Sequence, residues 1–540
     1  MSRAKRTEVA SWVALGVCVS FAVGLRFYAI ERLPGINGDE PQYAVHAHEF
    51  FAGAPLSALR TGSDLPMNPV FFGTVVILQM LFAPTLWSLR MSAVVLSLAT
   101  IALAWALTRQ RGAIFASTFA CLVAVLPIHL AYARFAWDPT AIPTVSLLAL
   151  AASSRRRIAL CLGAFLLCLW VHPTTVFLAP ALVTPFLTRY WARDRYGRWR
   201  WSQGQVLGAA LGLLVLPLTA AVMQLALERN WLPDAVAGVL RGDLLADAWH
   251  RAKDPAQLGR FLLAYLELLA GPTIYRYITG SISTRVGQVH VWLGAALLLP
   301  LVAAGLRAAV LRGRTRDVAI ALGLVLSLLL VYLLAGPVAL APKTERYAVC
   351  LTVPACYVLS ACVDALATTA ARARLLRLGL SVVAGALLLS FTSQYLQRLK
   401  YPDPLREDTF RTGETEPKAL ALQTIRELRD PAKMAVIYVE DWWIYWTFRY
   451  LAPPSSVPPI RVTIHRHAWD YRFPRDFWAP DFDAARMQAF GVAWAGHSTD
   501  ASFARRATER REIFGYDFGA ILRVYKLPGP PQRRRARQGQ

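Results

Sequence analysis

The sequence predicts an all-α polytopic membrane bundle with a small α/β domain at its C-terminal end. Of the 540 residues, 56% are hydrophobic, and the mean hydropathy is +0.38, which is too apolar for a soluble protein of this size. Apolar runs of roughly 16–22 residues recur along the first three quarters of the chain, and a helix needs about 20 apolar residues to cross a bilayer. Only helices and closed barrels satisfy their backbone groups in lipid, so these Leu-, Ala- and Val-rich runs indicate helices.

The basic residues indicate how the bundle is oriented. Lysine and arginine total 58 against 34 acidic residues, a net charge of +24. The basic patch with interleaved aromatic residues that is typical of nucleic-acid binding is missing from the sequence. The arginines instead cluster in short loops between apolar runs, as they do in the cytoplasmic loops of membrane proteins. We therefore place six basic segments in the cytoplasm: the N-terminus, Arg109–Arg111, Arg155–Arg157, Arg189–Arg200, Arg307–Arg316 and Arg372–Arg377.

About eleven spans connect these segments, with the N-terminus inside and everything after about residue 394 outside. They cover residues 10–30, 88–108, 113–133, 139–154, 158–171, 173–188, 205–226, 288–306, 317–336, 346–367 and 375–393. The apolar run Val70–Trp87 would reverse the side of every later basic loop, and it contains Gly73 and Pro84. We expect it to be an interfacial or re-entrant helix within a first outer loop, residues 31–87. A third outer loop, residues 227–287, holds another expected interfacial helix at Phe261–Leu269.

The composition changes after about residue 400, where charge rises and the apolar runs shorten to strand length. Strands alternating with helices predict a small α/β domain. The predicted strands are Met434–Glu440, Ile460–His465, Phe490–Ala495 and Ile521–Leu527, and the predicted helices are Pro417–Leu428, Asp441–Leu451, Phe482–Gln488 and Ser502–Phe514. The chain is thus divided into a transmembrane module, residues 1–395, and an outer domain, residues 396–540.

Two acidic residues directly follow the first predicted span, within the segment Gly38-Asp39-Glu40-Pro41-Gln42-Tyr43. Acids at the mouth of a membrane bundle are costly unless they face water or a partner. Glu40-Pro41 favours the start of a helix over residues 40–52, because proline and acids are both favoured in a first turn. Asp39 is either the N-cap of that helix or a functional carboxylate.

Two further outer segments carry polar residues suited to chemistry. Asp138 directly precedes the fourth span and is close to Arg134 in sequence. The predicted topology places it on the same side of the membrane as Asp39, and capping is again the alternative. Two carboxylates there can supply a base and orient a hydroxyl or a cation. The start of the tenth span carries Lys343, Arg346 and Tyr347. Arginine grips phosphate through its planar fork, and anchoring at the membrane interface is the alternative role.

The first-loop segment resembles the Asp-Glu-x-x-Tyr signature of C-type membrane glycosyltransferases, through Asp39, Glu40 and Tyr43. It is most similar to the aminoarabinose (lipid A) transferases and to bacterial relatives of protein O-mannosyltransferases. Three later segments resemble further motifs of that family in the same order: Arg90 at the start of the next helix, Asp138-Pro139, and Glu345-Arg346-Tyr347 ahead of Pro354. The similarity covers roughly residues 10–370.

This resemblance implies a glycosyltransferase in which Asp39 is the catalytic residue and Asp138 the second acidic position. The implied donor is an undecaprenyl- or dolichyl-phosphate sugar, and no metal or other cofactor is needed. In the aminoarabinose transferases a Lys of a Glu-Lys-Pro motif helps to bind the donor phosphate, whereas Asn68 stands in that place here. We expect the phosphate contact to fall on Arg134, Lys343 or Arg346 instead, and we expect a sugar other than aminoarabinose.

The expected reaction is sugar transfer, with inversion, from a polyprenyl-phosphate donor to an acceptor hydroxyl on the periplasmic side of the bacterial inner membrane. Asp39 would act as general base, and the acceptor is a glycan, a lipid or a protein. Two other functions remain open. One is a lipid or polysaccharide transporter, although the sequence lacks the internal repeats and broken helices typical of transporters. The other is a non-catalytic membrane anchor for the outer domain, in which Asp39 and Asp138 only cap helices.

Overall fold

The computed structural model describes residues 3–36, 39–61, 67–187, 244–279, 284–342, 344–400, 417–440, 442–452, 460–464, 483–495, 500, 503–514 and 520–528. The chain forms two compact units. A helical bundle comprises Met1–Ile30 and Ser63–Leu396, and a second unit comprises Glu31–Gly62 and Gln397–Gln540. The first-loop residues 31–62 therefore group with the C-terminal part of the chain rather than with the bundle.

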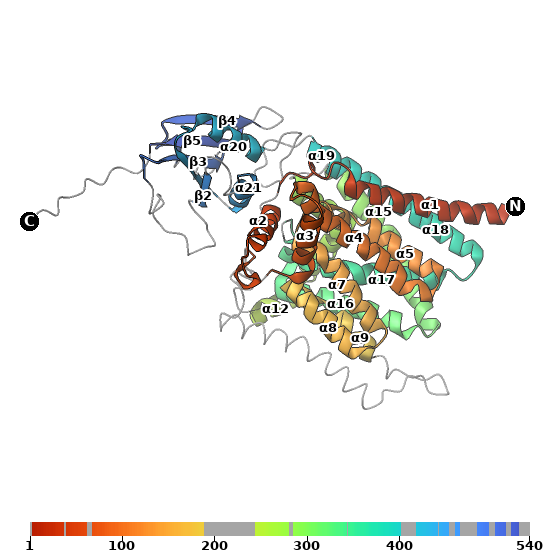
Figure 1. Cartoon of the computed structure of the whole chain (residues 1–540). Coiled ribbons are helices and arrows are strands. Elements are labelled where there is room, and N and C mark those ends of the chain that lie inside the picture. The colour runs from red at the N-terminus through yellow and green to blue at the C-terminus, as the bar shows by residue number, and fades with distance from the viewer. Residues whose placement is uncertain are drawn as a thin grey trace, which may run out of the picture. The chain divides into compact units, whose positions relative to one another are not determined.

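The long helices of the bundle coincide with the predicted spans (Figure 1). Each predicted span corresponds to one helix or to two in tandem, except residues 205–226, which lie outside the described residues. The described α-helices of the bundle are α1 (Arg3–Phe27), α3 (Pro69–Leu81), α4 (Leu86–Thr108), α5 (Ala113–Val125), α6 (Pro127–Tyr132), α7 (Ile142–Ser154), α8 (Ile158–Val171), α9 (Ala179–Leu187), α12 (Leu244–Ala252), α13 (Pro255–Ala270), α14 (Pro272–Thr279), α15 (Thr284–Leu311), α16 (Thr315–Ala335), α17 (Thr352–Leu366) and α18 (Ala370–Phe391).

Five of the helices in the described part of the chain are long and apolar enough to cross a membrane. Many of their apolar side chains, such as Val17, Leu166 and Leu389, are exposed on the bundle surface, which suits contact with lipid. The chain is thus a multi-pass membrane protein, and the number of eleven crossings stays a prediction.

The run Val70–Trp87 forms two structures rather than one helix. Helix α3 ends at Leu81, and α4 begins at Leu86 after a capping box in which Thr85 and Ser88 exchange hydrogen bonds. Thirteen residues of α3 rise only about 20 Å, which is short of a hydrocarbon core of about 30 Å. The run is therefore not one continuous helix, and its interfacial or re-entrant placement stays a prediction.

Glycine lets neighbouring helices of the bundle approach closely. A Cβ on Gly323 of α16 would lie 2.3 Å from the Thr184 hydroxyl of α9, and one on Gly305 of α15 would lie 2.3 Å from the Cβ of Cys362 in α17. Small residues at such crossings are typical of helix packing in membranes, where burial of apolar surface gives no advantage over lipid.

Three of the predicted basic loops meet at one end of the bundle. A cavity of about 250 Å³ there is lined by Arg111, Arg155 and Arg316, one from each loop. Arg111 also forms a two-pronged ion pair with the buried Asp317, with both N–O distances at 2.7 Å. These loops lie together, as the assignment of all basic loops to one side of the membrane requires.

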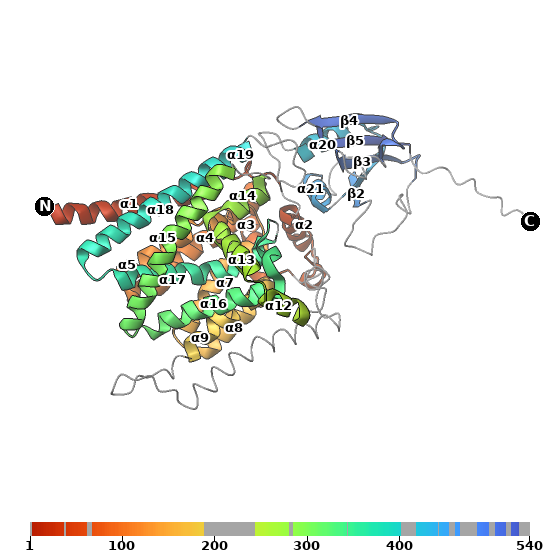
Figure 2. The ribbon, with the colours of Figure 1, turned by 180° about the vertical axis from the view of Figure 1, so that it is seen from behind.

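The C-terminal part forms a five-stranded mixed sheet in the order β2-β1-β3-β5-β4 (Figure 2). Strand β1 (Met434–Val439) pairs in parallel with β2 (Ile460–Ile464) and β3 (Met487–Trp494). Strand β5 (Ala520–Leu527) runs antiparallel to both β3 and β4 (Glu509–Phe514). Helices α20 (Pro417–Leu428) and α21 (Trp442–Leu451) match their predicted ranges closely, and α19 (Gln397–Lys400) begins the C-terminal segment of this unit.

Two of the predicted helices in this domain are wrong. Asp483–Arg486 forms a turn, and Met487 and Gln488 begin β3. The range Ser502–Phe514 contains the edge strand β4, whose Glu and Arg residues suggested a helix. Pairing with β5 overrides that local preference, and Glu512 of β4 lies 3.2 Å from Arg523 of β5 across the pair. Charged side chains are typical of edge strands because they oppose aggregation.

Alternate strand residues face opposite sides of the sheet, as the two-residue period of a strand requires. Ile437 and Val439 of β1 pack with Ile425 of α20 and with Phe448 of α21. On the other face, Val436 and Tyr438 pack with a second, smaller cluster that includes Phe503. Helix α21, which follows β1 directly, is thereby fixed on the sheet.

Candidate active site

Three arginines are completely buried near the end of α1. Arg134 donates to the carbonyl oxygens of Leu25 and Tyr28, the latter at 2.6 Å. Arg90 donates to the carbonyl of Ile30 at 2.6 Å, and Arg26 donates to the Ser97 hydroxyl at 2.8 Å. Carbonyls at the end of a helix lack intrahelical partners. Arg134 and Arg90 therefore hold the point at which the chain leaves α1 for the first loop.

The Asp138 segment is held by an aromatic cluster. The ring centroids of Tyr132 and Trp137 lie 5.7 Å apart, and Phe135 lies within 5.8 Å of both. The hydroxyl of Thr140 donates to the Tyr132 carbonyl at 2.8 Å. Asp138 is half-buried and begins a short 3-10 helix, η3 (Asp138–Ala141). The N-cap of η3 is Trp137, whose side chain makes no capping hydrogen bond, so Asp138 lies in the first turn rather than at the cap.

The Arg346 segment meets the Asp138 segment in the bundle. The half-buried guanidinium of Arg346 lies 5.1 Å from the centre of the Trp137 ring and 5.6 Å from that of Tyr347. The neighbouring Glu345 is fully buried and accepts a 2.8 Å hydrogen bond from the Tyr132 hydroxyl. Glu345, Arg346 and Tyr347 lie in the 3-10 helix η7 (Glu345–Leu351). Residues more than 200 positions apart thus form one polar and aromatic cluster, while Lys343 lies outside the described residues.

The first-loop acids lie on α2 (Asp39–Phe51), in the other unit. Asp39 begins the helix and is half-buried, whereas Glu40 is fully buried and Tyr43 is 3% exposed. The helix start expected at residue 40 is confirmed to within one residue. The carboxylate of Asp39 is in the first turn, where the helix dipole favours an anion, and it is the more accessible of the two acids.

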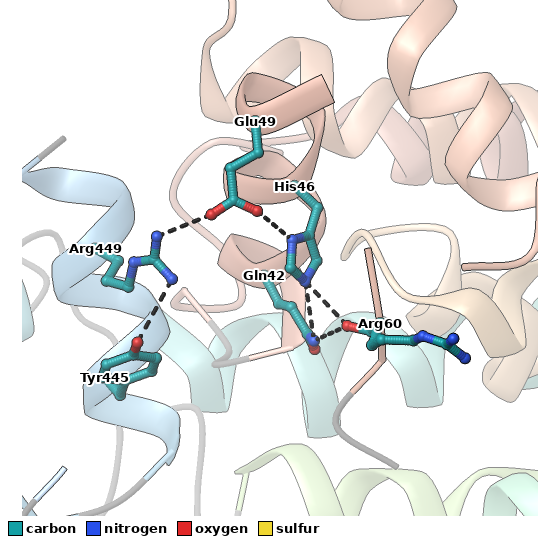
Figure 3. A network of polar contacts seen from close by, with 6 residues as sticks. All are labelled: Gln42, His46, Glu49, Arg60, Tyr445 and Arg449. Atoms are coloured by element: carbon teal, nitrogen blue, oxygen red, sulfur yellow. Dashed lines mark hydrogen bonds and ion pairs between the residues drawn. The ribbon is translucent and has the colours of Figure 1, made fainter. Parts of the chain in front are cut away.

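A polar network follows one face of α2 (Figure 3). Gln42, His46 and Glu49 recur at helical spacing, and the side chains of Gln42 and His46 both contact the Arg60 carbonyl, at 2.8 and 3.0 Å. His46 Nδ1 lies 2.7 Å from one oxygen of Glu49. The other Glu49 oxygen accepts from Arg449 of α21 at 2.9 Å. Helix α2 is therefore fastened to the C-terminal sheet domain within its own unit.

This network was not predicted from the sequence. The i, i+4, i+7 spacing of Gln42, His46 and Glu49 places them on one helix face, which was the available signal. Arg449, the partner of Glu49, lies 400 residues further along the chain. No local pattern in the sequence connects Glu49 with Arg449. Among the described residues no group of three or more His, Cys, Asp or Glu side chains is arranged to hold a metal ion, and metal-free chemistry stays a prediction.

The fold of the chain is similar to that of ArnT. No protein-family model and no curated protein sequence matches the chain. Two crystal structures of ArnT from Cupriavidus metallidurans, one in the apo state and one bound to undecaprenyl phosphate, share its fold at a TM-score of 0.54 each. They are 16% and 15% identical to this chain, cover 97% and 96% of it, and are themselves covered to 100% and 99%. ArnT is an aminoarabinose transferase, so the resemblance drawn from the sequence motifs is confirmed at the level of the fold.

Proposed function

We propose that the chain is an inner-membrane glycosyltransferase that moves a sugar from a polyprenyl-phosphate donor to an acceptor hydroxyl on the periplasmic side. The observation that carries this proposal is the likeness in fold to ArnT along nearly the whole chain, because one of those ArnT structures is bound to undecaprenyl phosphate. The acidic pair at the start of α2 supports it, since this is the segment that resembles the catalytic signature of the family.

In the proposed reaction Asp39 is the general base. It removes the proton from the acceptor hydroxyl while the oxygen forms a bond to the anomeric carbon of the sugar. The bond between that carbon and the phosphate oxygen breaks, and the polyprenyl phosphate leaves with the bonding electrons. A single displacement of this kind inverts the anomeric centre. The half-buried position of Asp39 suits this role better than the fully buried position of Glu40.

We assign the leaving phosphate to Arg346. Its guanidinium is half-buried and lies beside aromatic rings, so it is partly desolvated and holds an anion more strongly than a fully hydrated cation does. Arg134 is fully buried and donates to two backbone carbonyls, which makes it a support of the first loop rather than a phosphate ligand. Lys343 remains a second candidate for the phosphate contact, and Tyr347 lines the same segment.

Asp138 has a supporting role in this proposal. It belongs to the same cluster as Arg346, because Trp137 connects the two segments. A carboxylate there can orient an acceptor hydroxyl or a cationic group on the donor sugar. Glu40 and Tyr43 are buried on α2, so we expect them to contribute to donor binding by shaping the segment that carries Asp39.

The decisive experiment separates a transferase from a transporter. Deleting the gene should cause a lipid-linked sugar to accumulate, and mass spectrometry of extracted lipids identifies it. The purified protein is then placed in lipid nanodiscs with this lipid and with envelope extract of the deletion strain. It should release free polyprenyl phosphate and transfer the sugar of the lipid-linked donor to an acceptor in the extract. Movement of the lipid between leaflets of a vesicle, without any release of polyprenyl phosphate, would instead establish a transporter and refute the proposal.

A further inference from the structure

Four side chains of α2 and α21 form a closed circuit of contacts (Figure 3 shows three of them). His46 Nδ1 lies 2.7 Å from Glu49, and the second oxygen of Glu49 lies 2.9 Å from Arg449. The Arg449 guanidinium lies 5.1 Å from the centre of the Trp446 ring. The circuit closes because the Trp446 ring meets the His46 ring edge-on, at a centroid distance of 5.2 Å. Each helix contributes two members, so a rotation of either helix breaks at least one contact.

The circuit is also attached to the end of the first-loop segment. His46 Nε2 and the amide of Gln42 both contact the Arg60 carbonyl. His46 is 7% exposed and Gln42 is 3% exposed, so water does not readily replace these partners. Both ring nitrogens of His46 face oxygen acceptors, one a carboxylate and one a carbonyl, which fixes the orientation of the ring. The two ends of the segment from Gln42 to Arg60 therefore contact each other, and the segment is fixed to α21 through Glu49 and Arg449.

The position of Asp39 depends on this attachment. Asp39 precedes His46 by seven residues, which is almost two full helical turns, so the two side chains project from nearly the same face of α2. A rotation of α2 about its axis would move both by the same angle. Helix α21 is itself packed on the sheet through Ile444 and Phe448. The sheet domain thus sets the rotation of α2, and with it the face of the helix from which the Asp39 side chain projects, within this unit.

We propose that Arg449 is a positioning residue for the proposed transfer reaction: with Glu49, His46 and Trp446 it holds α2 in the orientation that Asp39 needs as base. This inference rests on the proposed function, and it gives the C-terminal domain a part in catalysis. Arg449 need not touch donor or acceptor. Small errors in the placement of a reacting group are expensive, since a misplacement of about 1 Å can cost on the order of 100-fold in rate.

The partial exposure of the ion pair keeps the test interpretable. The side chains of Glu49 and Arg449 are 35% and 29% exposed, and ion pairs at such positions contribute little to global stability. Neutral variants should therefore fold. We expect Arg449→Gln to lower kcat at least about tenfold. The donor KM should change less than kcat, because the proposed phosphate contact, Arg346, lies in the bundle rather than on α2. Arg449→Lys should recover part of the lost rate, since it restores the charge beside Glu49.

A double-mutant comparison on the full-length protein in nanodiscs completes the test. Because the circuit acts as a unit, Glu49→Gln combined with Arg449→Gln should be no slower than the slower single variant. Arg511→Gln is the matched control: its partner Glu509 lies 3.0 Å away in the same unit, on β4, and transfer should be unaffected.

Loss of an equal amount of activity in Arg511→Gln, or wild-type kcat in Arg449→Gln, would overturn the inference. If Asp39→Asn abolishes transfer while Arg449→Gln does not, only the positioning role fails; if wild type transfers no sugar, the proposed function fails.

Discussion

The segment proposed to carry the base and the segments proposed to contact the phosphate are held in place by different interactions, each within its own unit. In the bundle, the Arg346 and Asp138 segments are joined by buried groups. Tyr132, which is 2% exposed, donates through its hydroxyl to the fully buried Glu345, and its ring packs against that of Trp137. In the other unit, α2 is held by an ion pair whose members are about one-third exposed. Buried contacts are costly to break because the separated polar groups find no water. The strength of the partly exposed ion pair depends instead on pH and salt, so we expect the part that carries Asp39 to be the adjustable one.

The largest expected effect concerns the reacting group itself, in the adjustable part. Asp39→Asn removes the proton acceptor while keeping the size of the side chain and its place in the first turn of α2. Loss of a general base typically lowers a rate by about 10²–10⁴-fold. We therefore expect transfer to fall by that factor while the melting temperature in detergent stays close to that of wild type. If turnover stays within a few-fold of wild type, Asp39 is a structural residue and the base lies elsewhere.

The next effect concerns phosphate binding in the bundle. Arg346→Ala should weaken use of the polyprenyl-phosphate donor by roughly 10–150-fold, because a hydrogen bond to a charged group contributes about 1.5–3 kcal/mol. Donor-dependent kinetics measure this change. The matched control is Lys253→Ala, since Lys253 also lies over an aromatic ring, 4.4 Å from the centre of Trp249, and it has no proposed role. An unchanged donor dependence in Arg346→Ala would move the phosphate contact to Lys343.

A third prediction compares the two parts directly through stability. Tyr132→Phe removes a buried donor from Glu345, and leaving a buried polar group short of a partner costs about 1–3 kcal/mol. Tyr445→Phe removes a hydroxyl that accepts a long, 3.5 Å contact from Arg449 on a half-buried surface, and we expect a change within about 0.5 kcal/mol. Thermal unfolding in detergent measures both. Equal losses of stability would contradict the distinction between the two parts.

The smallest expected effect is a pH dependence confined to α2. The hydrogen bond from His46, followed by the charges of His46 and Arg449, lowers the pKa of Glu49 below its ordinary value of 4.5 in spite of its partial burial. A lowered carboxyl pKa gives stability that is fully present above pH 4.5 and is lost as the pH falls below that value. Hydrogen-exchange protection of α2 should therefore decrease below pH 4.5 in wild type, but not in Glu49→Gln. Wild-type protection that is the same well below pH 4.5 as at pH 7 would show that the ion pair does not hold the helix.

The acidic residues at the start of α2 illustrate what was predictable from the sequence. Proline and two acids after an apolar run indicate the beginning of a helix, and the structure begins α2 at Asp39. The edge strand β4 illustrates the opposite case. Its Glu- and Arg-rich sequence suggested a helix, and only the pairing of Arg511 with Val524 and of its neighbours with β5 made it a strand. Local propensity predicts structure where local interactions dominate, and it fails where a distant partner supplies the hydrogen bonds.

The sequence by itself determined that the protein is a membrane bundle with a small α/β domain, because the length of apolar runs and the distribution of arginines are set by the thickness and charge preference of the bilayer. It also determined the order of the motifs that resemble a glycosyltransferase. Only the tertiary structure decided that Arg134 supports the first loop, that Arg346 lies over Trp137, and that Glu49 pairs with Arg449. These contacts join residues that are roughly 100 to 400 positions apart, and such pairs depend on how complete elements pack rather than on any pattern within a segment of the chain.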